Sequence, residues 1–290
     1  IEAGHGWEDA QYRGSRDLIV WESEDLVHWG QERACPVGLP EAGCVWAPEA
    51  VFEQDRGEFM VFFASIVKAP GEQKSKQRIY AAYTKDFRTF SETFLYMERE
   101  EHVIDTTILE DGGRYYRISK DEVTKRLILE QSDSLLGEFA QVESRTLRDL
   151  AGVEGPEGYL LPDGRTWCLI ADQFLAGKGY LPMLTEDLDS GEFRILSAGE
   201  FDMGETKKRH GGVLQITDEE YQALQRAYGR KNPVAEGLYA DPDLYYEDGI
   251  YYIYPTTDAF PHWSGNEYYL FTSRDVRHFE RGNRILDVAT

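Results

Sequence analysis

The sequence predicts an all-β fold, a five-bladed β-propeller in which each blade has four antiparallel strands. Two repeated patterns carry this prediction. One is a polar turn that ends in an aromatic residue, and it occurs five times along the 290 residues. The other is a pair of apolar strands joined by a turn that contains Asp and Gly, and it occurs four times. One pair of strands around each kind of turn gives the four strands of one blade.

The aromatic-ended turns each follow an apolar run rich in β-branched or aromatic residues, such as 18–21 or 268–271. This pattern predicts the end of one strand, a tight turn and the start of the next strand. We expect the Asp of each turn, such as Asp86, to form the turn and not to act in chemistry. The five turns span residues 23–29, 84–90, 132–139, 185–193 and 273–279.

The Asp-Gly turns predict β-hairpins, because Asp-Gly between two apolar runs is a strong hairpin signal. The four hairpins span residues 50–63, 107–116, 159–170 and 244–254. The fifth blade would combine the opening strands of the chain with a strand predicted at 212–216. A helix is predicted over 218–228, with Thr217 as N-cap and Glu220 at the capping-box position.

Two domain organisations remain open. In the first, residues 1–290 form one complete propeller whose blades are circularly permuted, and the blade count of five favours it. In the second, residues 1–230 form an incomplete propeller and residues 231–290 form the first blade of a following domain. An open β-sandwich is the competing fold, but the turns are too regular for it.

The composition excludes several classes of function. Lys and Arg number 31 against 53 Asp and Glu, so the net charge is −22 and the pI is about 4.7. Binding to nucleic acid or to an anionic membrane surface needs the opposite sign of charge. No apolar run has the length of a membrane span, and no signal peptide opens the chain, so we expect a cytoplasmic protein. The three cysteines have no metal-binding spacing and are expected to be free and buried, although Cys35 and Cys44 are close enough in sequence to form a bridge.

Charged residues gather where the first strand of each blade begins. In a propeller these strands line the central channel, so their leading residues converge on one axis. Asp, Glu and His side chains converging in this way suit acid–base chemistry on a glycosidic bond. The five segments are 46–49, 104–106, 154–157, 209–212 and 239–243.

The motifs in these segments resemble glycoside hydrolase family 43, which comprises five-bladed propellers such as β-xylosidases, α-L-arabinofuranosidases and arabinanases. The resemblance covers nearly the whole chain. In the family the Ala-Asp-Pro blade comes first, whereas here it comes last, which is the reason for considering a permuted propeller. The motifs are Ala-Asp-Pro at 240–242, Trp-Ala-Pro-Glu at 46–49, Ile-Asp at 104–105, Glu-Gly-Pro at 154–156 and Arg-His-Gly at 209–211.

The resemblance implies a role for each matching residue. Asp241 matches the general base, Glu154 the general acid, and Asp105 the carboxylate that raises the pKa of the acid. His210 matches a central histidine that in family members lies near a calcium ion or a water molecule, so calcium is allowed but no cofactor is required. The segment containing Trp46 and Glu49 matches the wall of the sugar subsite. Aromatic rings stack on sugars, so Trp263 and Phe260 are further candidates for that wall.

The sequence therefore predicts an inverting hydrolase that releases terminal α-L-arabinofuranosyl or β-D-xylosyl units from plant cell-wall oligosaccharides. The alternatives are a non-catalytic sugar-binding propeller and a related five-bladed fructosidase or mannoside phosphorylase. Strand alternation predicts that Glu154 and Glu157 point to opposite faces, so that only one of them, taken to be Glu154, faces the axis. The segment Lys120–Glu122 follows a predicted central strand and is also within reach of the site.

Overall fold

The computed structural model describes residues 6–204, 206–229, 239–257, 267–276 and 279–287, and only the backbone at 239–242, 256–257 and 287. It divides into two compact units. The first comprises residues 1–24 and 29–215, and the second comprises residues 25–28 and 216–290. None of the described helices is long and apolar enough to cross a membrane.

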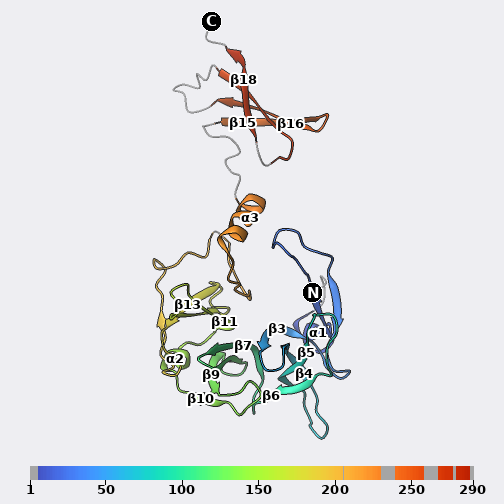
Figure 1. Cartoon of the computed structure of the whole chain (residues 1–290), viewed down its shortest axis with the longest axis vertical. Coiled ribbons are helices and arrows are strands. Elements are labelled where there is room, and N and C mark those ends of the chain that lie inside the picture. Colours follow the sequence, from blue (N-terminus) through green and yellow to red (C-terminus); the bar gives the residue numbers. More distant parts are fainter. Residues whose placement is uncertain (1–5, 205, 230–238, 258–266, 277–278, 288–290) are drawn as a thin grey trace. The chain divides into compact units, whose positions relative to one another are not determined.

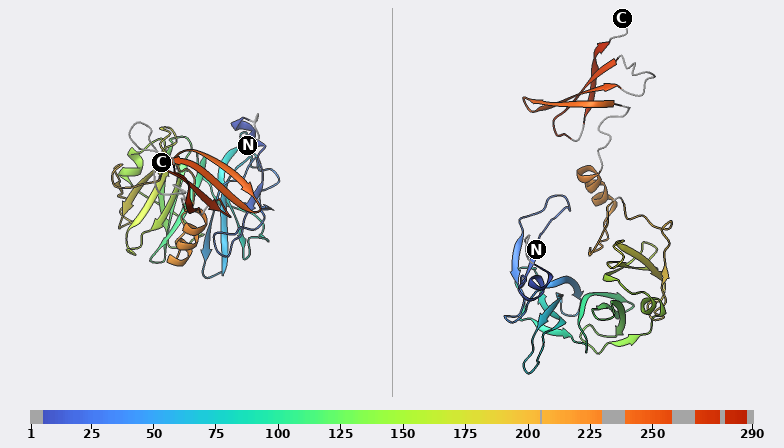
Figure 2. Two further views of the ribbon diagram at one scale, coloured as in Figure 1. Left: turned by 90° about the horizontal axis from the view of Figure 1, so that it is seen from above. Right: turned by 180° about the vertical axis from the view of Figure 1, so that it is seen from behind.

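The first unit contains three complete four-stranded antiparallel sheets and one two-stranded sheet. The sheets follow one another around an arc, seen from the front in Figure 1 and from behind in Figure 2. The short helix α1 (Trp7–Tyr12) precedes β1, and the short helix α2 (Arg145–Asp149) lies between β10 and β11. The two-stranded sheet pairs β1 (Asp17–Val20) with β2 (Arg33–Pro36). The first complete sheet contains β3 (Trp46–Glu53), β4 (Glu58–Val67), β5 (Lys76–Thr84) and β6 (Phe94–Met97). The second contains β7 (Val103–Asp111), β8 (Arg114–Asp121), β9 (Arg126–Ser132) and β10 (Ala140–Val142). The third contains β11 (Glu154–Leu160), β12 (Trp167–Asp172), β13 (Tyr180–Thr185) and β14 (Arg194–Ile195).

The turns fall where the sequence predicts them. Each predicted Asp-Gly hairpin joins the first and second strands of a sheet, as between β3 and β4. Four of the aromatic-ended turns join the third and fourth strands of a sheet, as between β5 and β6, and the turn at 23–29 joins β1 to β2. Asp86 caps its own turn, because Oδ1 accepts the backbone N–H groups of Arg88 and Thr89, each at 2.8 Å. The predicted all-β fold of four-stranded antiparallel blades is confirmed.

The core of the first unit lies between neighbouring sheets. Phe62, Ile79 and Ile108 belong to a buried cluster between the β3–β6 and β7–β10 sheets. Ile118, Leu169 and other apolar residues fill the next layer, between β7–β10 and β11–β14. As a result, the first strands of successive sheets lie side by side, with β7 in contact with both β3 and β11. This packing brings the leading residues of three blades together.

The second unit holds α3 (Asp218–Tyr228) and one four-stranded antiparallel sheet. The predicted capping box is present, because Glu220 N–H donates to Thr217 Oγ1 at 3.2 Å and Thr217 N–H donates to Glu220 Oε2 at 2.8 Å. The sheet contains β15 (Tyr239–Glu247), β16 (Ile250–Thr257), β17 (Glu267–Ser273) and β18 (Glu280–Asp287). The second unit thus holds its own four-stranded sheet. Closure of five blades into one ring, and the choice between one domain and two, stay predictions.

One predicted strand is wrong. Residues 211–216 form no strand, and residues 211–215 are exposed. A strand needs a partner to receive its backbone hydrogen bonds, and the described residues offer this segment none. Its backbone instead contacts side chains: Val213 N–H donates to Glu157 Oε1 at 2.8 Å, and Gly211 N–H donates to the hydroxyl of Tyr180. The three cysteines are free and buried, as predicted.

Candidate active site

The inner strands of the three complete sheets in the first unit begin with the same irregularity, a β-bulge. Glu154 of β11 pairs with Asp172 of β12, and Glu157 of β11 pairs with Ile170 of β12. Three residues along β11 therefore match two residues along β12. β3 has the same three-against-two shift and β7 a two-against-one shift. The extra residue adopts a left-handed conformation, with φ of 45° at Ala47, 48° at Asp105 and 52° at Gly155.

The bulge changes which residues share a face. Because one extra residue is inserted, Glu154 and Glu157 have the same orientation relative to the sheet. The prediction that strand alternation sends the two side chains to opposite faces is therefore wrong, because both lie on the same face of the sheet. Trp46 and Glu49 are related in the same way on β3.

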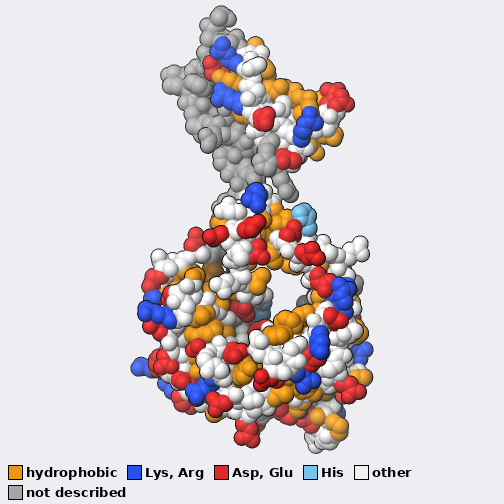
Figure 3. All heavy atoms as spheres, in the orientation of Figure 1, with side chains coloured by type: hydrophobic (Ala, Val, Ile, Leu, Met, Phe, Trp, Pro, Cys, Tyr) orange, Lys and Arg blue, Asp and Glu red, His pale blue; other side chains and the backbone are white. Residues whose placement is uncertain are grey.

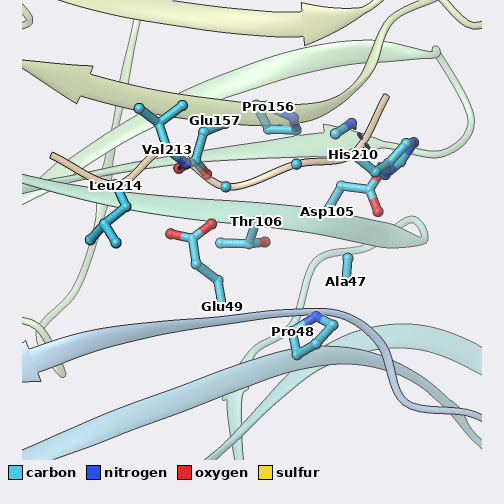
Figure 4. A pocket seen from close by; sticks show the side chains of 13 residues that line it. Ala47, Pro48, Glu49, Asp105, Thr106, Pro156, Glu157, His210, Val213 and Leu214 are labelled. Carbon is cyan, nitrogen blue, oxygen red and sulfur yellow. Dashed lines mark hydrogen bonds between the residues drawn. The ribbon is translucent and has the colours of Figure 1, made fainter. Parts of the chain in front are cut away.

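A pocket of about 600 Å³ lies at the start of these strands. Figure 4 shows Asp105 and His210 together at one end of it, and the carboxyl groups of Glu49 and Glu157 facing each other farther along. The wall is formed by residues from three blades and from the segment after residue 209: Ala47, Pro48, Glu49, Asp105, Thr106, Gly155, Pro156, Glu157, His210, Gly211, Gly212, Val213 and Leu214.

Glu154 lies beside the pocket and is surrounded by cations. Its Oε2 lies 2.7 Å from Lys120 Nζ, and its Oε1 lies 3.0 Å from both Arg209 Nη2 and His210 Nε2. Arg209 Nε also donates to Asp172 Oδ2 at 2.5 Å. Burial alone would raise the pKa of Glu154, but the hydrogen bonds from His210 and Lys120 and their charges outweigh it and lower the pKa to about 2. Glu154 is therefore held ionised by its neighbours, and its role as general acid stays a prediction.

Asp105 is buried, with 7% of its surface exposed, and its Oδ2 accepts the backbone N–H of Gly155 at 3.0 Å. Burial raises its pKa above the usual value, against the opposing influence of His210. The pKa of His210 is in turn raised by its hydrogen bond to Glu154. Asp105, Glu154 and His210 thus form one coupled group, as their convergence in the sequence pattern predicts.

Gly155 permits this close approach. A Cβ atom at position 155 would lie 2.9 Å from His210 Nδ1 and 3.0 Å from its Cε1. The glycine of the Glu-Gly-Pro motif therefore has two functions: it adopts the left-handed bulge conformation and it leaves space for the imidazole.

Asp105, Glu154 and His210 offer three ligand atoms within 4.8 Å of one another. They do not fit a protein-held calcium ion, however. Calcium prefers six to eight oxygen ligands, whereas this group supplies two carboxylates and an imidazole. In addition, Lys120 and Arg209 already neutralise Glu154.

The other predicted site residues differ in their placement. The ring of Trp46 packs against the core beside β7 and lies 5.0 Å from the ring of Trp7, and its neighbours Ala47 and Pro48 line the pocket in its place. Asp241 lies in β15 of the second unit, and its side chain is outside the described residues. Trp263 and Phe260 also lie outside the described residues.

Sequence reasoning missed Asp172 and gave too little weight to Glu157 and Lys120. Asp172 is completely buried and ends the apolar strand β12, directly opposite Glu154. A charged residue at the end of an apolar run is the only signal that the sequence offers for it. Lys120 ends up beside Glu154 because its own strand, β8, pairs with the inner strand β7.

Three blades thus bring several carboxyl groups to one pocket, an arrangement that suits acid–base chemistry. Residues 1–222 match the model of a family related to glycoside hydrolase family 43, described as a probable glycosyl hydrolase domain, and the chain belongs to this family.

The chain is also similar to individual proteins. The chain is 31% identical over 133 residues to an α-L-arabinofuranosidase of Bifidobacterium longum subsp. longum, a match that covers 40% of this chain and 12% of that protein. The chain thus matches about an eighth of the length of that relative. Among solved structures, a thermostable family-43 glycoside hydrolase is 13% identical with a TM-score of 0.47, over 92% of this chain and 86% of that one. A family-32 β-fructofuranosidase of Bombyx mori is 12% identical with a TM-score of 0.47, over 92% of this chain and 56% of that one.

Proposed function

We propose that this chain is an inverting glycoside hydrolase that releases terminal α-L-arabinofuranosyl units from plant cell-wall oligosaccharides. The observation that carries the proposal is the pocket of the first unit, where the environment pushes the pKa values of carboxyl groups in opposite directions. Glu154 is held ionised with a pKa of about 2, whereas burial and the charge of Glu157 raise the pKa of Glu49 to about 8. An inverting hydrolase needs one ionised and one protonated carboxyl group.

One support concerns the choice of sugar, and a second concerns the release of a terminal unit. The Bifidobacterium relative is an α-L-arabinofuranosidase, and it shares 31% of residues with the matched part of this chain. A pocket, in contrast to an open groove, also favours removal of one terminal unit. β-D-Xylosyl units are the second candidate substrate, because β-xylosidases belong to the family that the motifs resemble.

The ionised Glu154 suits the electrostatic demands of the reaction. Cleavage passes through a transition state in which positive charge develops on the sugar ring, and a carboxylate beside the pocket stabilises that charge. We propose that Asp105 and His210 fix the position of this carboxylate. The role of Asp241 as general base stays a prediction, and Asp241→Asn tests it directly.

The experiment is hydrolysis of nitrophenyl α-L-arabinofuranoside, β-D-xyloside and β-D-fructofuranoside by the full 290-residue chain. We expect cleavage of the arabinofuranoside and a loss of about 10²-fold or more in Glu154→Gln. Preferred cleavage of the fructofuranoside would move the protein to the fructosidase alternative. If no glycoside is cleaved while arabinose oligosaccharides still bind, the chain is a sugar-binding module. The ion pairs that surround the Glu154 carboxylate favour this alternative.

A further inference from the structure

Asp172 differs from most acidic residues of the chain in being completely buried. Acidic side chains are spread over the face of the first unit that Figure 3 shows, where water solvates them. Asp172 instead lies at the end of β12 with 0% of its surface exposed. A charge that is removed from water needs a partner. The ion-pair partners of Asp172 Oδ2 are Arg209 Nε at 2.5 Å and His210 Nε2 at 3.9 Å.

The guanidinium of Arg209 is shared between two carboxylates. Its Nε donates to Asp172 Oδ2, and its Nη2 donates to Glu154 Oε1 at 3.0 Å. The two carboxylates come from paired positions on neighbouring strands, since Glu154 of β11 lies opposite Asp172 of β12. A planar guanidinium can hold both because its N–H donors have a fixed fork geometry. Asp172 therefore anchors the cation that contacts Glu154.

The chain segment that carries Arg209 depends on side-chain contacts for its position. Residues 206–215 form neither helix nor strand. The next residue, His210, has a left-handed φ of 42°, which is costly for a residue with a Cβ atom. Strain of this kind persists only where the surrounding structure holds it. The ion pair between Asp172 and Arg209 ties the residue directly before the strained one to β12.

We propose that Asp172 is a positioning residue of the hydrolysis, which acts by holding the segment 209–210 against Glu154. The inference rests on the proposed function. Glu154 Oε1 contacts Arg209 and His210 at 3.0 Å each, so a movement of this segment changes the surroundings of the carboxylate. Asp172 lies outside the residues that line the pocket, so it acts through its partners and not on the substrate.

Kinetics of variants of the full chain on nitrophenyl α-L-arabinofuranoside test this role. Asp172→Asn keeps the shape of the side chain but removes the charge that anchors Arg209. Arg209→Lys keeps the positive charge but replaces the planar fork by a single nitrogen. Because the Arg209 side chain is 49% exposed, this variant tests the contact even where loss of the buried charge unfolds Asp172→Asn. The double variant combines both changes.

The matched control is Glu130→Gln. It removes the charge of another buried carboxylate, which is 6% exposed and pairs with Arg117 Nη2 at 2.9 Å. Glu130 lies in β9, outside the residues that line the pocket. This variant therefore separates the loss of a buried ion pair from the loss of a contact to the site.

We expect Asp172→Asn to lower kcat by about 10–10²-fold with KM nearly unchanged, since misplacing a group by about 1 Å costs up to about 10²-fold. Arg209→Lys should lose a similar factor. The double variant should lose no more than the larger single loss, because both changes break the same contact. Glu130→Gln should lose stability but keep kcat. If Asp172→Asn keeps the kcat of the wild type, or if the two losses multiply in the double variant, the positioning role is wrong.

Limited digestion with trypsin gives a readout that needs no activity. Lys207 and Lys208 precede Arg209 in the same segment, so trypsin cleaves there faster when the segment is released. We expect faster cleavage after these lysines in Asp172→Asn than in the wild type or in Glu130→Gln. If the wild type cleaves no glycoside, the proposed function fails. The digestion still decides whether Asp172 anchors the segment, and equal rates in Asp172→Asn and the wild type would overturn it.

Discussion

Lys120 is the buried cation that holds Glu154 ionised, so its replacement by methionine perturbs the site directly. Its side chain is 2% exposed, and Nζ lies 2.7 Å from Glu154 Oε2 and 2.6 Å from Glu122 Oε2. Methionine keeps most of the stem but removes the shared cation. Removing one partner of a buried ion pair costs about 3–5 kcal/mol. Because Glu154 keeps Arg209 and His210, each at 3.0 Å, we expect a loss of about 3 kcal/mol, the lower end of that range.

Urea unfolding at pH 7, followed by tryptophan fluorescence, measures this loss. Five of the six tryptophans lie in the first unit, so the signal reports mainly on it. The matched control is Lys125→Met, because Lys125 pairs with the same Glu122 at 2.5 Å but is 35% exposed, and an exposed pair is worth less than about 1 kcal/mol. Equal losses in Lys120→Met and Lys125→Met would refute the buried ion pair.

Three further predictions concern pH, backbone and metal. Because the pKa of Glu49 is raised to about 8 from 4.5, the folded protein keeps a proton that the unfolded chain releases. Stability should therefore fall as pH rises from about 4.5 to about 8, and Glu49→Gln should flatten this fall in urea unfolding. Gly155→Ala should cost about 1–2 kcal/mol for its left-handed φ of 52° and should also displace His210, lowering the pKa of that histidine in an NMR titration. Gly164→Ala, at φ 71° with open space around it, should leave His210 unchanged. Millimolar calcium and EDTA should give the same melting temperature, whereas a rise with calcium concentration would show that the ion binds.

The blades could be predicted from sequence because their turns carry local signals. Asp-Gly in each hairpin and Asp86 in its turn fix the backbone through contacts within a few residues. The strand predicted at 212–216 failed for the opposite reason. Its apolar pattern is local, but a strand also needs a neighbour, and the described residues provide none there. Strand pairing therefore depends on contacts that the local pattern does not encode.

The members of the candidate site could be predicted better than their protonation states. The motifs correctly brought Asp105, Glu154 and His210 together. They did not reveal the bulge at Gly155, which places Glu157 on the same side as Glu154. They also did not reveal that Lys120, 34 residues before Glu154 in the sequence, neutralises it. The charge of a carboxyl group depends on such long-range contacts.

The configuration of the first product tests the central claim most directly. Proton NMR can follow the sugar released from nitrophenyl α-L-arabinofuranoside by the full chain, before mutarotation mixes the anomers. An inverting hydrolase with one protonated and one ionised carboxyl group predicts that β-L-arabinofuranose appears first. Appearance of the α anomer first would contradict this claim, because retention requires a covalent intermediate on a carboxylate.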